Sequence, residues 1–109
     1  MKQGDIVLVP FPFSDLSSIK TRPALVISNQ HLKGEDVILI GLTSQRGGKY
    51  SIALENSDLE EGELPLRSFI RYHKVVSLKK SIVRRQVCTI SPSKRKEVLK
   101  ALGSLLEVK

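Results

Sequence analysis

Three short stretches carry cationic or hydroxyl side chains directly beside apolar runs, where they could hold a phosphate group. In the first, Lys20-Thr21-Arg22-Pro23, the arginine would lie at the mouth of the core, and a guanidinium there can hold a phosphate through two hydrogen bonds. The second, Thr43-Ser44-Gln45, ends an almost wholly apolar run and contributes two hydroxyls and an amide as donors. The third begins at Arg67-Ser68 and continues through Arg71, Tyr72 and His73.

Each stretch could also have a purely structural role, and the sequence pattern alone does not decide between that role and phosphate binding. An arginine before a proline can simply pair with an acid at the start of a strand, and Thr-Ser after a strand usually completes a turn. His73 follows Tyr72 on a predicted strand, where the two side chains point to opposite faces, so His73 can be an ordinary surface residue. His31 lies in a turn beside Lys33, and no pattern brings the two histidines together as an acid–base pair on RNA. Cys88 has no indicated partner and is interpreted as a small core residue.

The elements that must position these side chains are mostly strands. Runs rich in Ile, Val and Leu predict strands at residues 5–9, 22–28, 36–43, 50–55, 68–78 and 83–90. Pro10 and Pro12 lack a backbone N–H and predict an edge or a loop start after the first of these strands. The acidic residues 55–63 predict a surface loop.

One helix is expected at the C-terminal end. Ser91 is a good N-cap, and Pro92 suits the first helical position. Apolar residues then recur every three or four positions and form one face, at Val98, Leu99, Leu102, Leu105 and Leu106. We therefore expect a mainly β fold class with a C-terminal helix, as a small, strongly bent sheet or barrel capped by that helix. Residues 1–109 are expected to form a single domain.

The distribution of charge favours a polyanionic partner. The chain has 18 Lys and Arg against 11 Asp and Glu, a formal net charge of +7. Residues 1–66 carry a net charge of −3, whereas residues 67–109 carry +10. Nucleic acid is the commonest partner of such a one-sided basic surface, and a merely solvated surface is the alternative. With 5% aromatic residues, an extensive base-stacking platform is not expected.

Composition and motifs exclude several other classes. The longest apolar run is far shorter than a membrane span, and the first ten residues do not follow the pattern of a secretory signal, so we expect a cytoplasmic protein. One cysteine cannot form an internal disulfide, and no metal, P-loop, dinucleotide or catalytic-triad motif occurs. No metal or other cofactor is therefore expected.

Several blocks in the same order resemble the MazF/PemK toxin family, whose fold is also called CcdB-like. These blocks are GDIVLVPF at the start, KTRPALVIS, LTSQ at the end of the third strand, and SFIRYHKVVSL. The resemblance spans roughly residues 4–106, and the spacing between Gly-Asp-Ile and the Arg-Pro block is its most specific part. The first loop departs from the family, because PFPFSDLSSIK has neither the Gly nor the Glu that many members carry there.

The resemblance implies a fold and an activity. It implies an SH3-like β-barrel that forms a homodimer, and a toxin of a type II toxin–antitoxin pair that arrests growth by cutting single-stranded mRNA without a metal. It implies Arg22 and Thr43 as catalytic residues. RNA-binding roles are expected for Lys20, Thr21, Ser44, Gln45, Arg46, Ser68, Arg71 and His73. The implied partners are single-stranded RNA, a cognate antitoxin and, through the antitoxin complex, DNA; no membrane partner is expected.

The chemistry of such a cleavage follows from RNA itself. Without a metal, the neighbouring 2′-hydroxyl attacks the phosphate and leaves a 2′,3′-cyclic phosphate and a 5′-hydroxyl. Arg22 would stabilise the charge that develops on the non-bridging oxygens, and Thr43 would donate a hydrogen bond. The pKa of an arginine is too high for a general base at neutral pH, and the sequence identifies no general acid. Among titrating side chains, His73 is the only candidate near these residues in the pattern.

Two other functions stay open on the sequence. One is an SH3-like module that binds nucleic acid or protein without chemistry. The other is a toxin of the same fold that poisons a topoisomerase such as gyrase. RNA cleavage in a chelator would favour the nuclease, whereas salt-dependent binding without products would favour the module.

Overall fold

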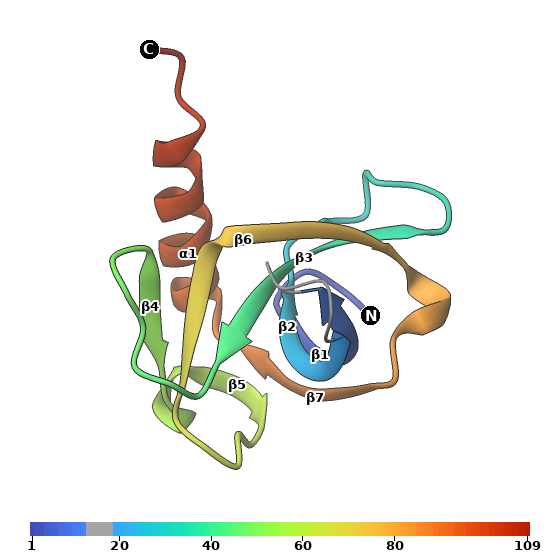
Figure 1. Cartoon of the computed structure of the whole chain (residues 1–109), viewed down its shortest axis with the longest axis horizontal. Helices are drawn as coiled ribbons and strands as arrows, with labels where there is room; N and C mark the ends of the chain where they lie inside the picture. Colours follow the sequence, from blue (N-terminus) through green and yellow to red (C-terminus); the bar gives the residue numbers. More distant parts are fainter. Residues whose placement is uncertain (13–18) are drawn as a thin grey trace.

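Within the described residues, seven strands form one curled antiparallel sheet, and one α-helix packs against it (Figure 1). The computed structural model describes the backbone of residues 1–12 and 19–109, and the side chains of residues 1–10 and 21–109. The strands are β1 Asp5–Pro12, β2 Ile19–Val26, β3 Asp36–Thr43, β4 Ser51–Leu54, β5 Leu59–Gly62, β6 Ser68–Lys79 and β7 Arg85–Ile90. Short 3-10 turns occupy Asn56–Asp58 (η1) and Lys80–Ile82 (η2), and α1 spans Pro92–Leu105. This architecture confirms the fold class expected from the sequence.

The order of the strands across the sheet is β4-β6-β3-β2-β1-β7-β5. The long strand β6 bends, because its pairing with β3 shifts between Ile40, which pairs with Val75, and Leu42, which pairs with Ile70. Residues 71–74 therefore bulge out of the ladder with β3, and Figure 1 shows β6 turning there to follow the curve of the sheet. The first residues of β6 also pair with β4 on their other side.

The apolar runs form the core that their pattern predicts. Ala24, Leu25 and Val26 are all buried, so β2 is covered on both of its faces. Residues 9–12 of β1 pair with β2, whereas the pairing of β1 with β7 ends at Leu8. The two prolines thus lie in an edge segment, as expected, but they continue the strand rather than begin a loop, because β2 is long enough to pair with them.

The acidic stretch 55–63 differs from its prediction, because it contains η1 and β5 instead of a loop alone. Leu59 pairs with Ile90 of β7 and is half-buried. Gly62 has a φ of +81°, and a Cβ there would lie 2.8 Å from the carbonyl oxygen of Val87. Strand β5 forms because β7 has an edge to pair with and Gly62 permits the close approach, neither of which a local pattern reveals.

The helix begins as predicted and ends with less burial than predicted. The Ser91 Oγ accepts a hydrogen bond from the backbone N–H of Lys94 at 3.2 Å, and Pro92 is the first helical residue. Val98 is fully buried, but Leu105 and Leu106 are 44% and 72% exposed. Figure 1 shows why, since the C-terminal part of α1 extends beyond the sheet. In the described residues no helix is both long and apolar enough to cross a membrane.

A buried carboxylate ties the start of the chain to β7. Asp5 is 1% exposed and accepts hydrogen bonds from the Lys2 backbone N–H (2.8 Å), the Lys2 ammonium (3.2 Å) and the Thr89 hydroxyl (2.9 Å). Burial alone would raise the pKa of Asp5, but these hydrogen bonds and the charge of Lys2 outweigh it and lower the pKa below the ordinary 3.8. Asp5 is therefore a charged anchor of the fold.

Candidate active-site groove

A groove of about 500 Å³ opens where β2 begins and β3 ends. Its lining comes from six parts of the chain: β1, β2, the end of β3 with Ser44 after it, the connection from β5 to β6, the first residue of β6, and β7. The lining residues are Leu8, Thr21, Arg22, Pro23, Leu42, Thr43, Ser44, Glu63, Leu64, Pro65, Leu66, Ser68, Arg85 and Val87. Apolar walls with a few polar groups directed at one space are typical of a binding or catalytic site.

The register of two strands brings Arg22 and Thr43 together. In the ladder between β2 and β3, Ala24 pairs with Gly41. The paired residues end at Ala24 and Gly41; continued by two residues, the same antiparallel register would set Arg22 opposite Thr43, and both residues line the groove. On its other side Arg22 pairs with Val9 of β1, so its backbone is fixed by a strand. The Arg22 residue is half-buried in the groove wall.

The connection from β5 to β6 forms the opposite wall, and hydrogen bonds hold it at both ends. The Leu64 backbone N–H donates to the side-chain oxygen of Asn56 at 2.8 Å, and Leu64 is buried. The Ser68 hydroxyl donates to the Leu66 carbonyl oxygen at 3.1 Å. Since its proton is engaged in this bond, Ser68 is suited to holding the wall rather than to donating to a ligand.

The hydroxyl of Thr43 is oriented by its own turn. Its Oγ1 accepts a hydrogen bond from the Gln45 backbone N–H at 3.2 Å, which is the turn that a Thr-Ser pair after a strand suggests. A hydroxyl that accepts one hydrogen bond still has its proton to donate. The structural and the functional explanations of Thr43 are thus compatible, because the turn fixes the side chain that would donate into the groove.

The structure brings together five of the residues singled out in the sequence and separates the others. Thr21, Arg22, Thr43, Ser44 and Ser68 all line the groove. Four others do not line it: Gln45 and Arg46, which are exposed in the loop after β3, and Arg71 and His73, which lie in the bulge of β6. The side chain of Lys20 lies outside the described residues.

Two charged residues of the groove were missed. Glu63 belongs to the acidic stretch interpreted as a loop, and it brings a carboxylate into the groove wall. Arg85 begins β7 and brings a second guanidinium. The basic pair Arg84-Arg85 was the available signal for Arg85, but only the pairing of β7 with β1 shows which arginine reaches the groove.

Neither a reactive thiol nor a cluster of metal ligands is found among the described residues. Cys88 is buried, as a core residue should be, and burial together with the nearby charge of Asp5 raises the pKa of its thiol from 9.0 to about 11. Such a thiol is a poor nucleophile. In the part of the chain that the structure describes, no three His, Cys, Asp or Glu side chains are grouped as a metal site would need.

Solved structures share this fold. An endoribonuclease in complex with its cognate antitoxin, from a mycobacterial species, is 20% identical and has a TM-score of 0.77, with 100% of this chain and 97% of that chain covered. MazF from Deinococcus radiodurans is 24% identical (TM-score 0.75; 97% of this chain and 96% of that chain). The MazF of a MazE–MazF structure from the same organism is 23% identical (TM-score 0.73; 100% and 97%). No curated protein matches the sequence.

The sequence itself matches a toxin family over nearly its full length. The family, described as PemK-like, MazF-like toxin of type II toxin-antitoxin system, matches residues 2–106. This match covers every described strand and the helix, and it confirms the resemblance seen in the short blocks. The chain therefore belongs to the PemK-like, MazF-like family of toxins of type II toxin–antitoxin systems.

Proposed function

We propose that this toxin is a metal-independent endoribonuclease that cleaves single-stranded RNA in the groove between β2, β3 and the connection from β5 to β6. The observation that carries the proposal is that Arg22 and Thr43 both line one open groove. Similar structures named as endoribonucleases support the same activity. The products are a 2′,3′-cyclic phosphate and a 5′-hydroxyl.

Three polar residues of the groove contact the phosphates of the RNA in this proposal. Arg22 stabilises the charge on the non-bridging oxygens of the phosphorane-like transition state, and its partial burial strengthens that interaction. Thr43 donates a hydrogen bond from its hydroxyl to the same phosphate. Arg85 binds a neighbouring phosphate of the RNA, because a guanidinium can hold two phosphate oxygens.

A proton must also leave the attacking 2′-hydroxyl. We assign this step to the carboxylate of Glu63, because Glu63 lines the groove and His73 does not. Glu63→Gln keeps the size of the side chain and removes its basicity, so kcat should fall by about a hundredfold. Glu61→Gln is the matched control, since Glu61 is exposed on β5 and does not line the groove.

The proposed partners follow from the family and from similar structures. Structures of relatives contain a cognate antitoxin, and we propose that an acidic antitoxin segment covers the basic surface of this toxin as well. We further propose that the toxin acts in the cytoplasm as a homodimer, and that it contacts DNA only through the antitoxin complex.

The direct test is to incubate the purified chain with long single-stranded RNA in the presence of EDTA. Internal cuts are expected, and a ligase that joins a 3′-hydroxyl to a 5′-phosphate should accept the ends only after the cyclic phosphate is removed and the 5′-hydroxyl is phosphorylated. RNA that stays intact at high protein concentration, but binds in a salt-dependent way, would support the non-catalytic binding module instead.

A further inference from the structure

A cluster of rings lies outside the groove, on the neighbouring strands β4 and β6. Tyr50, just before β4, packs edge-on against Tyr72, with ring centroids 6.2 Å apart and an interplanar angle of 85°. The ring of His73 lies 5.2 Å from that of Tyr50, at 53°. The Lys49 ammonium lies 5.7 Å from the Tyr50 centroid. Two of the five aromatic residues of the chain thus meet a histidine and a cation at one place.

The fold holds these rings in place through the loop 44–50 and the bulge of β6. The Tyr72 backbone N–H donates to the Tyr50 carbonyl oxygen at 3.2 Å, which joins the two segments. The Ser51 hydroxyl donates to the Gly48 carbonyl oxygen at 2.7 Å. Gly47 packs so closely on Ser51 that a Cβ at residue 47 would overlap the Ser51 hydroxyl. The loop is therefore tightly folded, and Tyr50 is positioned by contacts on both sides.

The cluster is accessible and surrounded by positive charge. Tyr50 is 37% exposed and His73 is exposed, while the half-buried Tyr72 supports them from the core side. Residues 44–50 and 71–74 together contain four Lys or Arg side chains and no Asp or Glu. Exposed rings beside cations are the features with which proteins bind single-stranded nucleic acid, through base stacking and phosphate contacts.

Both segments that build the cluster start in the groove. Ser44 lines the groove, and the loop that it begins ends at Tyr50. Ser68 lines the groove as well, and β6 runs from Ser68 to His73, a span of roughly 17 Å for an extended strand. A single strand of RNA leaving the groove can follow either segment and reach the rings.

We propose that Tyr50 and His73 form a base-binding subsite, on which an unpaired base of the RNA stacks a few nucleotides from the scissile phosphate. The inference rests on the proposed function and extends it, because it names where the RNA is held outside the groove. It also gives Arg71 and His73, which lie outside the groove, a role in binding RNA rather than in the reaction.

The experiment measures RNA binding separately from cleavage. Dissociation constants are measured by fluorescence anisotropy with short single-stranded RNA of randomised sequence, in which 2′-fluoro groups replace the attacking hydroxyls. Tyr50→Ala should weaken binding by about tenfold, whereas Tyr50→Phe, which keeps the ring, should bind within about twofold of wild type. His73→Ala, at an exposed site, is a second variant that tests the same subsite with little effect on folding.

Cleavage of ordinary RNA by the same proteins gives an independent readout. Tyr50→Ala should raise KM by about tenfold and leave kcat nearly unchanged, because stacking far from the phosphate is equally strong in substrate and transition state. Thermal unfolding of each variant confirms that the fold is kept.

The outcomes separate this inference from the proposed function. Unchanged binding by both Tyr50→Ala and His73→Ala would overturn the subsite, and so would equal losses for Tyr50→Ala and Tyr50→Phe, even if wild type cleaves RNA normally. If Tyr50→Ala changes the oligomeric state in sedimentation while RNA affinity stays the same, the rings are a contact between copies of the chain. If wild type binds RNA through the rings but never cuts it, the subsite stands and the endoribonuclease fails. A wild type that binds no RNA overturns both.

Discussion

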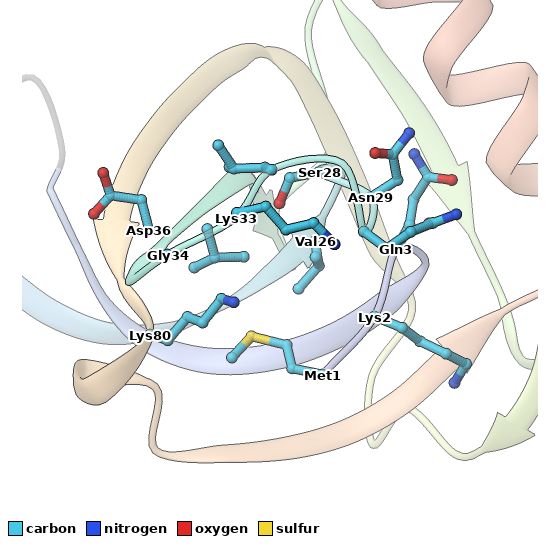
Figure 2. A pocket seen from close by; sticks show the side chains of 13 residues that line it. Met1, Lys2, Gln3, Val26, Ser28, Asn29, Lys33, Gly34, Asp36 and Lys80 are labelled. Carbon is cyan, nitrogen blue, oxygen red and sulfur yellow. The ribbon is translucent and has the colours of Figure 1, made fainter.

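Two pockets of this molecule both contain cationic side chains, but these side chains differ in their exposure and in how the backbone supports them. The groove has a volume of about 500 Å³, and a second pocket, lined by the N-terminus, the loop between β2 and β3, and η2, has about 350 Å³. Figure 2 shows Lys33 and Lys80 extending over this second pocket, while Lys2 points away from it. Lys33 and Lys80 are exposed, whereas Arg22 of the groove is half-buried and held by a strand.

From this contrast we expect that placement on a strand and partial burial suit Arg22, rather than the exposed lysines, to act on a phosphate. A lysine ammonium is strongly hydrated and moves on a flexible stem, so it binds anions weakly at an exposed site. A guanidinium on a strand, between apolar walls and next to an oriented hydroxyl, loses little entropy when a phosphate arrives. The second pocket instead lies beside the first residues of the chain, because Lys2 and Gln3 line it. Lys2 is hydrogen-bonded to the buried carboxylate of Asp5.

The largest effect is expected for Arg22→Ala. Loss of the guanidinium should lower kcat for RNA cleavage by at least about a hundredfold, because charge on the phosphate is no longer stabilised. The unfolding midpoint should change little by comparison. Steady-state cleavage with a fluorescent RNA measures the rate, and Arg84→Ala is the matched control on an exposed arginine that does not line the groove. Normal cleavage by Arg22→Ala would place the reaction elsewhere.

Asp5→Asn should show the opposite signature, with lower stability and normal cleavage by the folded protein. Removing the buried charge weakens its hydrogen bonds with Lys2 and Thr89, and we expect a loss of about 2 kcal/mol in the free energy of unfolding near neutral pH. Urea unfolding measures this loss. Asp36→Asn, at an exposed residue of the second pocket, is the control and should cost far less.

The pH dependence of unfolding of Asp5→Asn tests whether the charged form of Asp5 stabilises the fold. The folded-state pKa of Asp5 is lower than 3.8, so the charged form stabilises the fold, and this contribution is complete well above pH 3.8. It is lost as the pH falls through the lower folded-state value. The stability difference between wild type and Asp5→Asn should therefore shrink in acid, and a difference that grows in acid would contradict the assignment.

Thr43→Val should have a smaller effect on cleavage than Arg22→Ala. The variant keeps the shape of the side chain and removes one hydrogen bond to the charged phosphate, which predicts a decrease in kcat of about tenfold to thirtyfold. Thr43→Ser keeps the hydroxyl and should retain most of the activity. If both variants lose the same activity, the turn to Gln45 matters more than the donated proton.

The smallest effect is expected in the second pocket. Lys33→Ala and Lys80→Ala should each change kcat/KM by less than about twofold at physiological salt, because exposed charges remote from the groove are screened. Their salt dependence of RNA binding should also match that of wild type. A loss approaching that of Arg22→Ala would mean that the two pockets act together on one RNA.

Local pattern predicted much of the fold because the signals are local. The third strand was predicted with its observed bounds, Asp36–Thr43, since its run of Ile, Val and Leu is uninterrupted. The helix start followed from Ser91 and Pro92 in the same way. Strand β5 could not be predicted, because an acidic segment becomes a strand only where β7 presents an edge to it. Leu105 and Leu106 belong to the predicted apolar face of the helix but are exposed, because the pattern of a helix does not show where the sheet beneath it ends.

Contiguous blocks of sequence were enough to predict the family, most strands and the start of the helix. They also pointed to Arg22 and Thr43 as candidate site residues, because the Arg-Pro and Thr-Ser blocks each lie together in the chain. Only the tertiary structure decided which other side chains share their space. It brought Glu63 and Arg85 into the groove and placed His73 beside Tyr50 outside it. The physical reason is that strand pairing and the bend of β6 set distances between residues far apart in sequence, and no spacing along the chain encodes those distances.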